Sequence, residues 1–504
     1  MLFNSYIFIF IFLPLALLGY FTLNHFKKFE LSKLFLAGMS LWFYAYFDIY
    51  YLWVIVGSIL VNYLFSYIIQ RFYSSKGELS LTVKRLFVVI GVLINLGLLF
   101  YFKYLDFFIE NINALVGSHF RLHNILLPLG ISFFSFQQMS FIIDRARGKA
   151  EHYSFINYIT FVTFFPQLIA GPIVLYTEMM PQFESEQNKH FRFDNFSKGT
   201  ILFTLGLSKK VLLADVLAQS VNYGFANAIF LDTTSTVLMM LAYTFQIYFD
   251  FSGYSDMAMG LGYMFNIELP VNFNSPYKAC SVKELWQRWH MTLSRFFIQY
   301  VYIPLGGSRN GRFRTLINIF LVFFFSGIWH GANWTYIAWG TMQGLLVVWD
   351  NLGIIGVKGS NDKIKVHFQM PRPLGWFLTF SFFNLSLLFF GSDSMKTAFQ
   401  MFKNLFAFTN TGHVYKLANS TKITELYFIT KACDLKFPEY SNILSLIIYV
   451  VFLFICGLII KGKNALEITK ETTFSRKTYI LTAILLAWNI ISFSQVSTFI
   501  YFNF

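Results

Sequence analysis

The chain has 504 residues, of which 56% are hydrophobic, 21% aromatic and only 13% charged, and its mean hydropathy is +0.54. Soluble domains carry roughly 25% charged residues, so a string of water-soluble domains is excluded. The 65 Phe and 29 Tyr suit contact with lipid and packing between helices. The sequence predicts an all-α, polytopic integral membrane protein, which places its function among transporters, channels and membrane enzymes.

The 39 Lys and Arg against 25 Asp and Glu give a formal charge of +14. Basic residues gather in short clusters between apolar runs, at 27–33, 71–85 and 145–149. This is the positive-inside pattern of membrane proteins, so we expect a lipid bilayer as partner and no nucleic acid. The cysteines at 280, 433 and 456 have no metal-ligand spacing, and we predict no metal site and no disulfide framework.

The first apolar run extends from Leu2 to about Phe26 without a cleavage site, which predicts a retained span. Because Lys27 and Lys28 follow it directly, the N-terminus is predicted to be periplasmic. The stretch 34–69 would be about 54 Å long as one helix, too long for a ~30 Å hydrocarbon core. We therefore predict a hairpin that turns near Asp48, and a second pair of segments near 86–109 and 125–143.

From residue 150 onward the pattern is irregular, since the apolar run 155–176 contains Pro166, Gly171 and Pro172. Broken backbone at membrane depth is tolerated only where it is buried in protein or lines a cavity. In all, about ten to twelve membrane segments are expected, including broken or re-entrant helices. The polar stretch 393–442 is predicted to be a partly folded cap between spans. Further apolar segments lie near 200–226, 236–265, 315–348, 376–391, 443–460 and 479–501.

Two carboxylates, Asp250 and Asp256, lie in an apolar setting, where ionisable groups are costly and suggest a function. Their spacing of six puts them on opposite sides of a straight helix, so they do not form an obvious acid and base pair. Ion pairing with Arg or Lys that orients helices is the favoured interpretation.

The segment 284–300 reads as an interfacial amphipathic helix at 100° per residue. Arg288, Thr292 and Arg295 fall on one face, which we expect to meet water and phosphates. His290 falls on the apolar face, where a histidine is more often a core residue than a functional one.

The run 315–348 contains a single ionisable residue, His330. As one helix it would be about 51 Å long, so a break is expected, and Gly327, Gly331 and Asn333 place it within 326–334. A neutral imidazole tolerates burial, and its pKa of ~6.5 lets it take a proton from a hydroxyl near neutral pH.

Other catalytic signatures are absent from the sequence, including GxSxG, P-loop, HExxH and GxGxxG motifs. His119 and His123 have i, i+4 spacing, but no third ligand lies beside them, so coincidence is favoured over a metal site.

Several long blocks together resemble the membrane-bound O-acyltransferases, and specifically the alginate O-acetyltransferase-like branch that includes peptidoglycan and cellulose O-acetylation proteins. The first 150 residues match that family in hydropathy only. The blocks are FFPQLIAGPI (164–173), the stretch 245–277, WQRWHMTLSRFF (286–297), YIPLGGSRNG (302–311), FFFSGIWHGANWTYIAWG (323–340) and the terminal FIYFNF (499–504).

The resemblance implies a single domain over 1–504 in which a helical bundle surrounds a central tunnel to a buried histidine. Its parts would be N-terminal spans to 150, a catalytic core over 151–350 with both histidine motifs, and C-terminal spans and a loop over 351–504. By motif match, His330 would be the catalytic residue and His290 its partner. The remaining expected substrate-binding residues are Trp286, Trp329, Asn333, Trp334, Arg288 and Arg295.

The resemblance also implies acetyl transfer from cytoplasmic acetyl-CoA, with no permanently bound cofactor, through the bacterial inner membrane to a cell-envelope polysaccharide. A separate periplasmic O-acetyltransferase is the expected partner. His330 would act as general base or receive the acetyl group, while His290 would orient the donor carbonyl or stabilise the oxyanion. Arg288 and Arg295, with Arg309, Arg312 and Arg314, would attract the coenzyme A phosphates.

No residue selects the acceptor or the oligomeric state. Abundant Phe, Ile, Asn and Lys, as an A/T-rich genome would produce, put peptidoglycan first, ahead of alginate and cellulose-like exopolysaccharide. The alternative is a polytopic transporter or flippase for an envelope precursor, because broken helices around buried polar residues also mark transport sites. A transporter would neither hydrolyse acetyl-CoA nor become labelled by it, which distinguishes the two.

Overall fold

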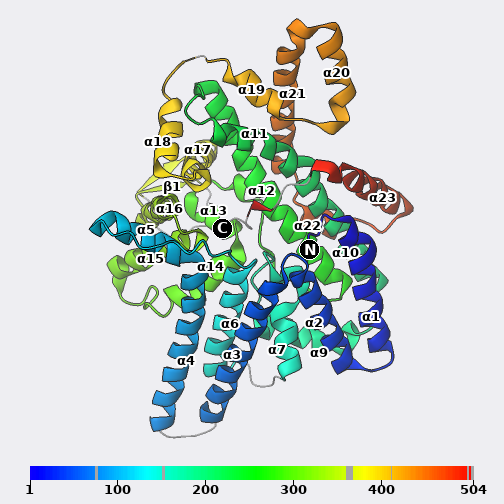
Figure 1. Ribbon diagram of the computed structural model, residues 1–504, viewed down its shortest axis with the longest axis vertical. Coiled ribbons are helices and arrows are strands. Elements are labelled where there is room, and N and C mark those ends of the chain that lie inside the picture. Colours follow the sequence, from blue (N-terminus) through cyan, green and yellow to red (C-terminus); the bar gives the residue numbers. More distant parts are fainter. Residues whose placement is uncertain (74–77, 150–153, 359–366, 410, 496–498, 501–504) are drawn as a thin grey trace. The chain divides into compact units, whose positions relative to one another are not determined.

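The computed structural model describes residues 1–73, 78–149, 154–358, 367–409, 411–495 and 499–500 (Figure 1). The chain divides into two compact units, the first comprising Met1–Phe203 and Ser255–Val271 and the second Thr204–Tyr254 and Asn272–Phe504. Both are helical, as expected for an all-α protein. Among the described residues the sheet consists of two three-residue parallel strands, β1 and β2, in the second unit. The single domain over 1–504 stays a prediction.

The first unit contains the helices of the N-terminal part of the chain. The bounds are α1 (Leu13–His25), α2 (Phe29–Ala45), α3 (Ile49–Tyr73), α4 (Glu78–Leu99), α5 (Leu105–Val116), α6 (Ile131–Ala146), α7 (Phe155–Thr163), α8 (Phe165–Leu168), α9 (Tyr176–Glu184) and α10 (Phe193–Ser208), whose last turn belongs to the second unit.

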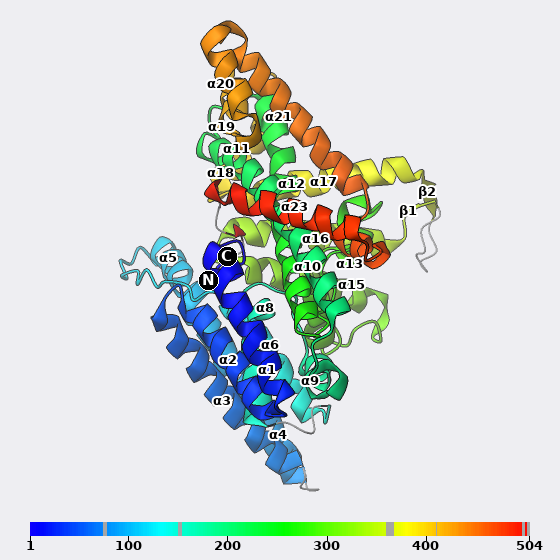
Figure 2. The same cartoon turned by 90° about the vertical axis from the view of Figure 1, so that its right-hand side faces the viewer.

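The predicted hairpin over 34–69 is confirmed by α2 and α3. The turn forms at Asp48, whose side chain accepts a hydrogen bond from the Tyr50 N–H at 2.8 Å, as residues that cap a helix N-terminus do. Helices α3 and α4 then run side by side as a long pair, drawn in blue in Figures 1 and 2. The predicted pair near 86–109 and 125–143 corresponds to α4 with α5, joined by a π-helical turn, and to α6.

The interrupted stretch 155–176 forms short helices instead of one span, as predicted. Helix α7 ends at Thr163, α8 has four residues, and α9 begins at Tyr176. Aromatic rings fill the space around this break: the Phe165 ring lies 5.1 Å from Phe12 and 5.7 Å from Phe265. The abundance of Phe therefore supplies the core of this unit as well as contacts to lipid.

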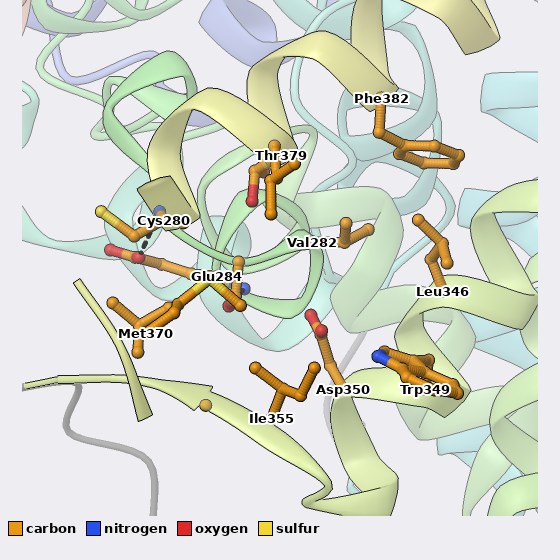
Figure 3. A pocket seen from close by; sticks show the side chains of 15 residues that line it. Cys280, Val282, Glu284, Leu346, Trp349, Asp350, Ile355, Met370, Thr379 and Phe382 are labelled. Carbon is orange, nitrogen blue, oxygen red and sulfur yellow. Dashed lines mark hydrogen bonds between the residues drawn. The ribbon is translucent and has the colours of Figure 1, made fainter. Parts of the chain in front are cut away.

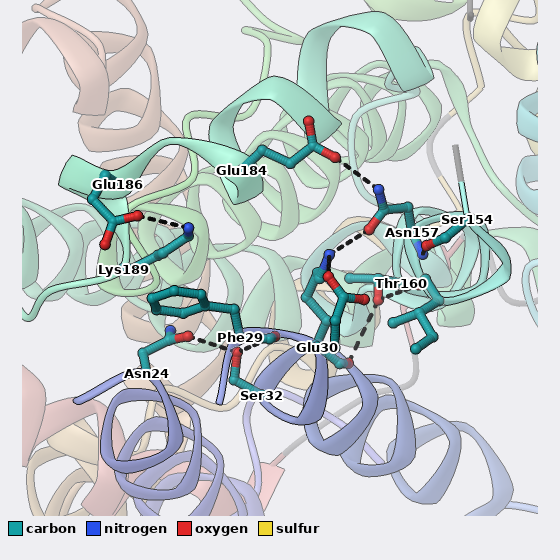
Figure 4. Close-up of polar contacts among 12 residues, drawn as sticks. Asn24, Phe29, Glu30, Ser32, Ser154, Asn157, Thr160, Glu184, Glu186 and Lys189 are labelled. Carbon is teal, nitrogen blue, oxygen red and sulfur yellow. Dashed lines mark hydrogen bonds and ion pairs between the residues drawn. The ribbon is translucent and has the colours of Figure 1, made fainter. Parts of the chain in front are cut away.

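Buried polar contacts tie α2, α7 and α9 together within the first unit (Figure 4). The Lys33 ammonium lies 2.6 Å from the Glu30 carboxylate and donates to Asn157 Oδ1 at 2.5 Å. Asn157 in turn donates to Glu184 Oε1 at 2.7 Å. Because Lys33 is buried, these partners offset the cost of removing its charge from water.

The second unit contains the remaining helices and both strands. The bounds are α11 (Asp215–Ala226), α12 (Thr233–Met264, whose residues from Ser255 belong to the first unit), α13 (Val282–Arg288), α14 (Met291–Phe297), α15 (Gly311–His330), α16 (Trp334–Leu352), β1 (Ile355–Val357), β2 (Phe368–Met370), α17 (Arg372–Gly391), α18 (Met395–Asn404), α19 (His413–Ser420), α20 (Tyr427–Lys436), α21 (Pro438–Lys461), α22 (Ala465–Glu471) and α23 (Arg476–Ile491).

The break predicted within 326–334 is confirmed, because α15 ends at His330 and α16 begins at Trp334. These two helices pack closely where Gly327 faces Gly340: a Cβ built on Gly340 would lie 2.7 Å from the Gly327 Cα. Small residues permit such close backbone approach between membrane helices. The stretch 393–442, predicted to be a partly folded cap, contains the helices α18, α19 and α20.

Within the described residues, six helical segments are long and apolar enough to cross a membrane. They support a multi-pass membrane protein, while the figure of ten to twelve segments stays a prediction. The six are Phe8–His25, Ile49–Arg71, Thr82–Val116, Gly311–His330, Arg372–Gly391 and Pro438–Lys461.

Candidate active site

The segment that carries His290 is not the continuous helix predicted over 284–300. Helix α13 ends at Arg288, and His290 adopts a left-handed conformation with φ of 42° before α14 begins. Backbone groups of a distant segment cause the break: Asn274 N–H donates to the Arg288 carbonyl, and Met291 N–H donates to the Asn272 carbonyl, both at 2.9 Å. The predicted cationic face is therefore wrong, because Arg288 and Thr292 lie on separate helices.

His290 is 1% exposed and lies against aromatic rings within the second unit. The Phe251 ring meets the imidazole edge-on at a centroid distance of 4.7 Å and an angle of 88°. Asn272 holds the other side of the ring, with its Oδ1 3.1 Å from His290 Nδ1. Left-handed φ is uncommon outside glycine, and strain of this kind persists only where surrounding contacts impose it.

The contacts of Asn272 decide the tautomer of His290. Asn272 Oδ1 also accepts hydrogen bonds from Thr292 N–H at 3.3 Å and Thr292 Oγ1 at 2.9 Å, and a backbone N–H can only donate. The atom that meets His290 is thus an acceptor, so Nδ1 carries the proton. Burial lowers the pKa of His290 to about 3, so the ring is neutral and Nε2 is its acceptor nitrogen. The expected role of His290, orienting the donor carbonyl or stabilising the oxyanion, stays a prediction.

His330 forms the C-terminal end of α15 and is 2% exposed. The Trp329, Trp339 and Phe390 rings surround the imidazole at centroid distances of 4.9, 5.0 and 5.2 Å. The next residue, Gly331, is extended, and a Cβ there would lie 2.2 Å from the Tyr336 ring. A larger residue at this position would therefore require the Tyr336 ring to move.

One indole connects the two histidines. The Trp329 ring lies 4.9 Å from the His330 ring and 6.2 Å from the His290 ring, and all three residues belong to the second unit. The structure therefore brings together residues 40 positions apart in a largely apolar, aromatic setting. Such a setting is poor in water and suits a reaction in which water would compete as acceptor.

The family model of the membrane-bound O-acyltransferases matches residues 119–392, more than half of the chain and the part that holds both histidines. The chain belongs to the membrane-bound O-acyltransferase family. It is accordingly a membrane-bound acyltransferase.

Curated relatives of this membrane-bound O-acyltransferase include the peptidoglycan O-acetyltransferase of Helicobacter pylori, which is 37% identical over 100% of this chain and 98% of the relative. The probable alginate O-acetylase AlgI of Pseudomonas aeruginosa is 37% identical over 81% of this chain and 75% of the relative. The teichoic acid D-alanyltransferase of Streptococcus thermophilus is 29% identical over 52% and 68%. Similarity to the first relative extends over the first 150 residues, beyond the shared hydropathy noted there.

The other expected substrate-binding residues of this membrane-bound O-acyltransferase differ in burial and in their contacts. The Trp286 ring lies 5.7 Å from Trp339, and its indole N–H donates to Gln343 Oε1 at 3.1 Å. Trp334 is 54% exposed. Asn333 caps α16 by accepting from Thr335 N–H, and its amide donates to the Asp393 carbonyl at 2.7 Å.

The expected cationic residues occupy different environments. Arg288 pairs with Glu284 at 2.9 Å and remains about one-third exposed, with a further bond to the Asn274 carbonyl at 3.3 Å. Arg295 is half-buried in α14. Arg312 donates to the Leu352 carbonyl at the end of α16.

A cavity of about 210 Å³ lies where the start of α13 meets the end of α16, the strands and α17 (Figure 3). Its two carboxylates already accept hydrogen bonds from backbone: Cys280 N–H donates to Glu284 Oε2 and Lys283 N–H to Asp350 Oδ2, each at 2.9 Å. The figure shows the first of these bonds beside Met370. These bonds fix the N-terminal end of α13, which leads to His290.

Several residues that shape the site were missed from the sequence, namely Asn272, Phe251, Trp339 and Phe390. The block 245–277 contained the first two, and an asparagine amid apolar residues at 272 was the available signal. Phe390 had no signal, because one more phenylalanine in an apolar helix is indistinguishable from a packing residue. The terminal residues 501–504 of the FIYFNF block lie outside the described residues.

Proposed function

We propose that this membrane-bound O-acyltransferase transfers acetyl groups for the O-acetylation of a cell-envelope polysaccharide, with peptidoglycan as the first acceptor and alginate or a cellulose-like exopolysaccharide next. The observation that carries the proposal is the pair of buried histidines on one indole, in a chain similar over its full length to a peptidoglycan O-acetyltransferase. The acetyl donor is acetyl-CoA from the cytoplasm.

In the proposed step, an acceptor hydroxyl attacks the thioester carbonyl, the new C–O bond forms, and the C–S bond breaks. His330 takes the hydroxyl proton and returns it to the departing thiolate, so charge and protons balance. His290 accepts a hydrogen bond at Nε2, which orients a hydroxyl or thiol beside the reacting carbon. The apolar rings of Trp329, Trp339 and Phe390 keep water from the thioester.

Arg288 and Arg295 would attract the phosphates of coenzyme A at the cytoplasmic side, together with the arginines of the 306–314 loop. Arg288 remains partly exposed although it pairs with Glu284, so its guanidinium can exchange that partner for phosphate. Localisation in the bacterial inner membrane with a periplasmic N-terminus, and transfer to a separate periplasmic O-acetyltransferase, complete the proposal.

The test uses inverted membrane vesicles supplied with radiolabelled acetyl-CoA. The wild-type protein should release coenzyme A or acquire label, and His330→Ala should lower the rate by about 10²–10⁴-fold, the usual cost of removing a positioned base. Trp53→Phe serves as the control, because it alters an exposed ring in α3, a helix that holds none of the expected site residues.

Normal insertion of the His330→Ala protein together with an undiminished rate would contradict the proposed role of His330. If wild-type vesicles neither released coenzyme A nor acquired label, and instead accumulated an envelope precursor, the transporter alternative would replace acetyl transfer. Mass analysis of acetyl esters in purified wall and exopolysaccharide, with and without the gene, identifies the acceptor.

A further inference from the structure

A buried ion cluster lies apart from the two histidines, within the second unit. The Lys210 ammonium is 2.8 Å from Asp215 Oδ1 and 2.7 Å from Asp250 Oδ1, and all three side chains are at most 5% exposed. The pairing of Asp250 with a lysine confirms the ion pair expected from the sequence. Burying ions is costly unless each is paired, yet here two carboxylates share one ammonium. One of these carboxylates, Asp250, also has a second partner.

The second partner of Asp250 is a backbone amide 250 residues later in the chain. The other oxygen of Asp250, Oδ2, accepts a hydrogen bond from Ile500 N–H at 2.7 Å. Asp250 therefore holds an ammonium with one oxygen and a backbone amide with the other. Asp215 pairs with the same lysine at nearly the same distance, while the acceptor of the Ile500 N–H is Asp250.

The residue before Ile500 is in contact with the wall of the histidine site. The Phe499 ring is 2% exposed, stacks on Tyr254 at 4.7 Å and lies 5.7 Å from Phe251. Phe251, the immediate neighbour of Asp250, is the ring that meets His290 edge-on at 4.7 Å. Phe251 is thus next to Asp250 in the chain and next to Phe499 in space, and its ring limits where the imidazole can lie.

We propose that Asp250 is a positioning residue for His290. Asp250 is held by Lys210 and binds the Ile500 N–H. This bond keeps Phe499 packed against Phe251, the ring that contacts His290. This inference rests on the proposed acetyl transfer only where kcat is measured. A loss of this anchor shifts a reacting group without removing it, and a misplacement of about 1 Å can cost up to 10²-fold in rate.

The test compares three inserted, full-length variants. Asp250→Ala and Asp215→Ala each leave Lys210 with one carboxylate, but only the first removes the acceptor of Ile500 N–H. Asp250→Asn keeps an oxygen for that amide. We expect kcat to fall about 10- to 10²-fold in Asp250→Ala with the KM for acetyl-CoA unchanged, and to stay within a few-fold of wild type in the other two.

Adding Phe499→Ala closes a double-mutant cycle. If Asp250 acts through the 499–500 segment, Phe499→Ala lowers kcat as Asp250→Ala does, and the double variant is no slower than the slower single one. Equal losses in Asp215→Ala and Asp250→Ala, or strictly additive losses in the cycle, would show that the cluster only stabilises the fold and would overturn the proposal.

Hydrogen exchange of the peptide that contains residue 500 gives a readout independent of the acetyl donor. Its protection should fall in Asp250→Ala and remain at the wild-type level in Asp215→Ala and Asp250→Asn. Unchanged protection in Asp250→Ala would overturn the anchor even if acetyl transfer is confirmed. Lost protection in Asp250→Ala alone would support it even if the proposed function fails.

Discussion

At the scale of single residues, the chemistry of the site depends on which nitrogen of each imidazole carries a proton. For His290, the neighbouring Asn272 determines the tautomer. Asn272 Oδ1 accepts a hydrogen bond from the Thr292 N–H, so the same oxygen also accepts from His290 Nδ1. An asparagine that fixes a tautomer acts on the reaction without touching the substrate. Its removal should therefore affect rate more than donor affinity.

We predict that Asn272→Ala lowers kcat by about 10- to 10²-fold, because His290 loses the bond that orients it. Buried donors left without their acceptor should also reduce the free energy of unfolding by about 1–3 kcal/mol. Thr292→Val is the control: it removes one hydroxyl from Asn272 but leaves the bond to His290, and its kcat should stay near that of wild type. A fully active, normally inserted Asn272→Ala protein would refute the tautomer assignment.

At the scale of elements, His330 is placed by the close approach of α15 and α16. Gly327 and Gly340 let the two backbones meet, and Gly331 lets α16 start beside the imidazole. Side chains at Gly327 or Gly340 would push α15 and α16 apart. The pairing of these helices is thus a precondition for the aromatic enclosure of His330.

We predict that Gly340→Ala destabilises the protein by about 1–3 kcal/mol, since its Cβ would lie 2.7 Å from both the Gly327 Cα and the Phe323 carbonyl oxygen. Gly457→Ala in α21 is the matched control, as a Cβ there meets nothing within 4 Å. Thermal unfolding in detergent should show a lower Tm for the first variant only. Equal Tm values for the two variants would mean that the helices accommodate the methyl group.

The elements that could be predicted from the sequence are those fixed by local signals. Asp48 caps a helix after a short turn, Pro166 interrupts an apolar run, and Gly331 stops α15, so their breaks were found. The break at His290 was missed because its cause is not local: the Asn274 N–H donates to the Arg288 carbonyl, and the Asn272 carbonyl accepts from the Met291 N–H. The two histidines were located by motif, whereas their shared Trp329 and the role of Asn272 required the structure.

At the scale of the whole molecule, the basic clusters predict which loops face the cytoplasm. The 27–33 turn should be cytoplasmic because it is itself a basic cluster. The 117–124 stretch between α5 and α6 should be periplasmic, because it lies at the opposite end of these helices from the basic clusters at 71–85 and 145–149. The membrane orientation is a property of the complete chain and is tested on the complete chain.

A cysteine placed at Lys27 should react with a membrane-impermeant maleimide only in inverted vesicles, and one at Ser118 only in intact spheroplasts. Both substitutions are made after Cys433, the partly exposed native thiol, is replaced by serine. Labelling of position 27 from the periplasmic side would reverse the predicted orientation. Cysteine variants near Arg288 test that segment separately. Their labelling from the periplasmic side would place Arg288 on the side of the membrane that lacks coenzyme A.

The bond between Asp250 and Ile500 also has a consequence for biosynthesis. A ribosome adds about 5–20 residues per second, so the 250 residues between them take on the order of 10–50 s to make. For the last 170 of these residues, which take roughly 8–34 s, α12 and both histidines exist without the contact to residues 499–500. A nascent chain therefore holds an incomplete histidine site, and full activity is expected only after residues 499–500 have docked.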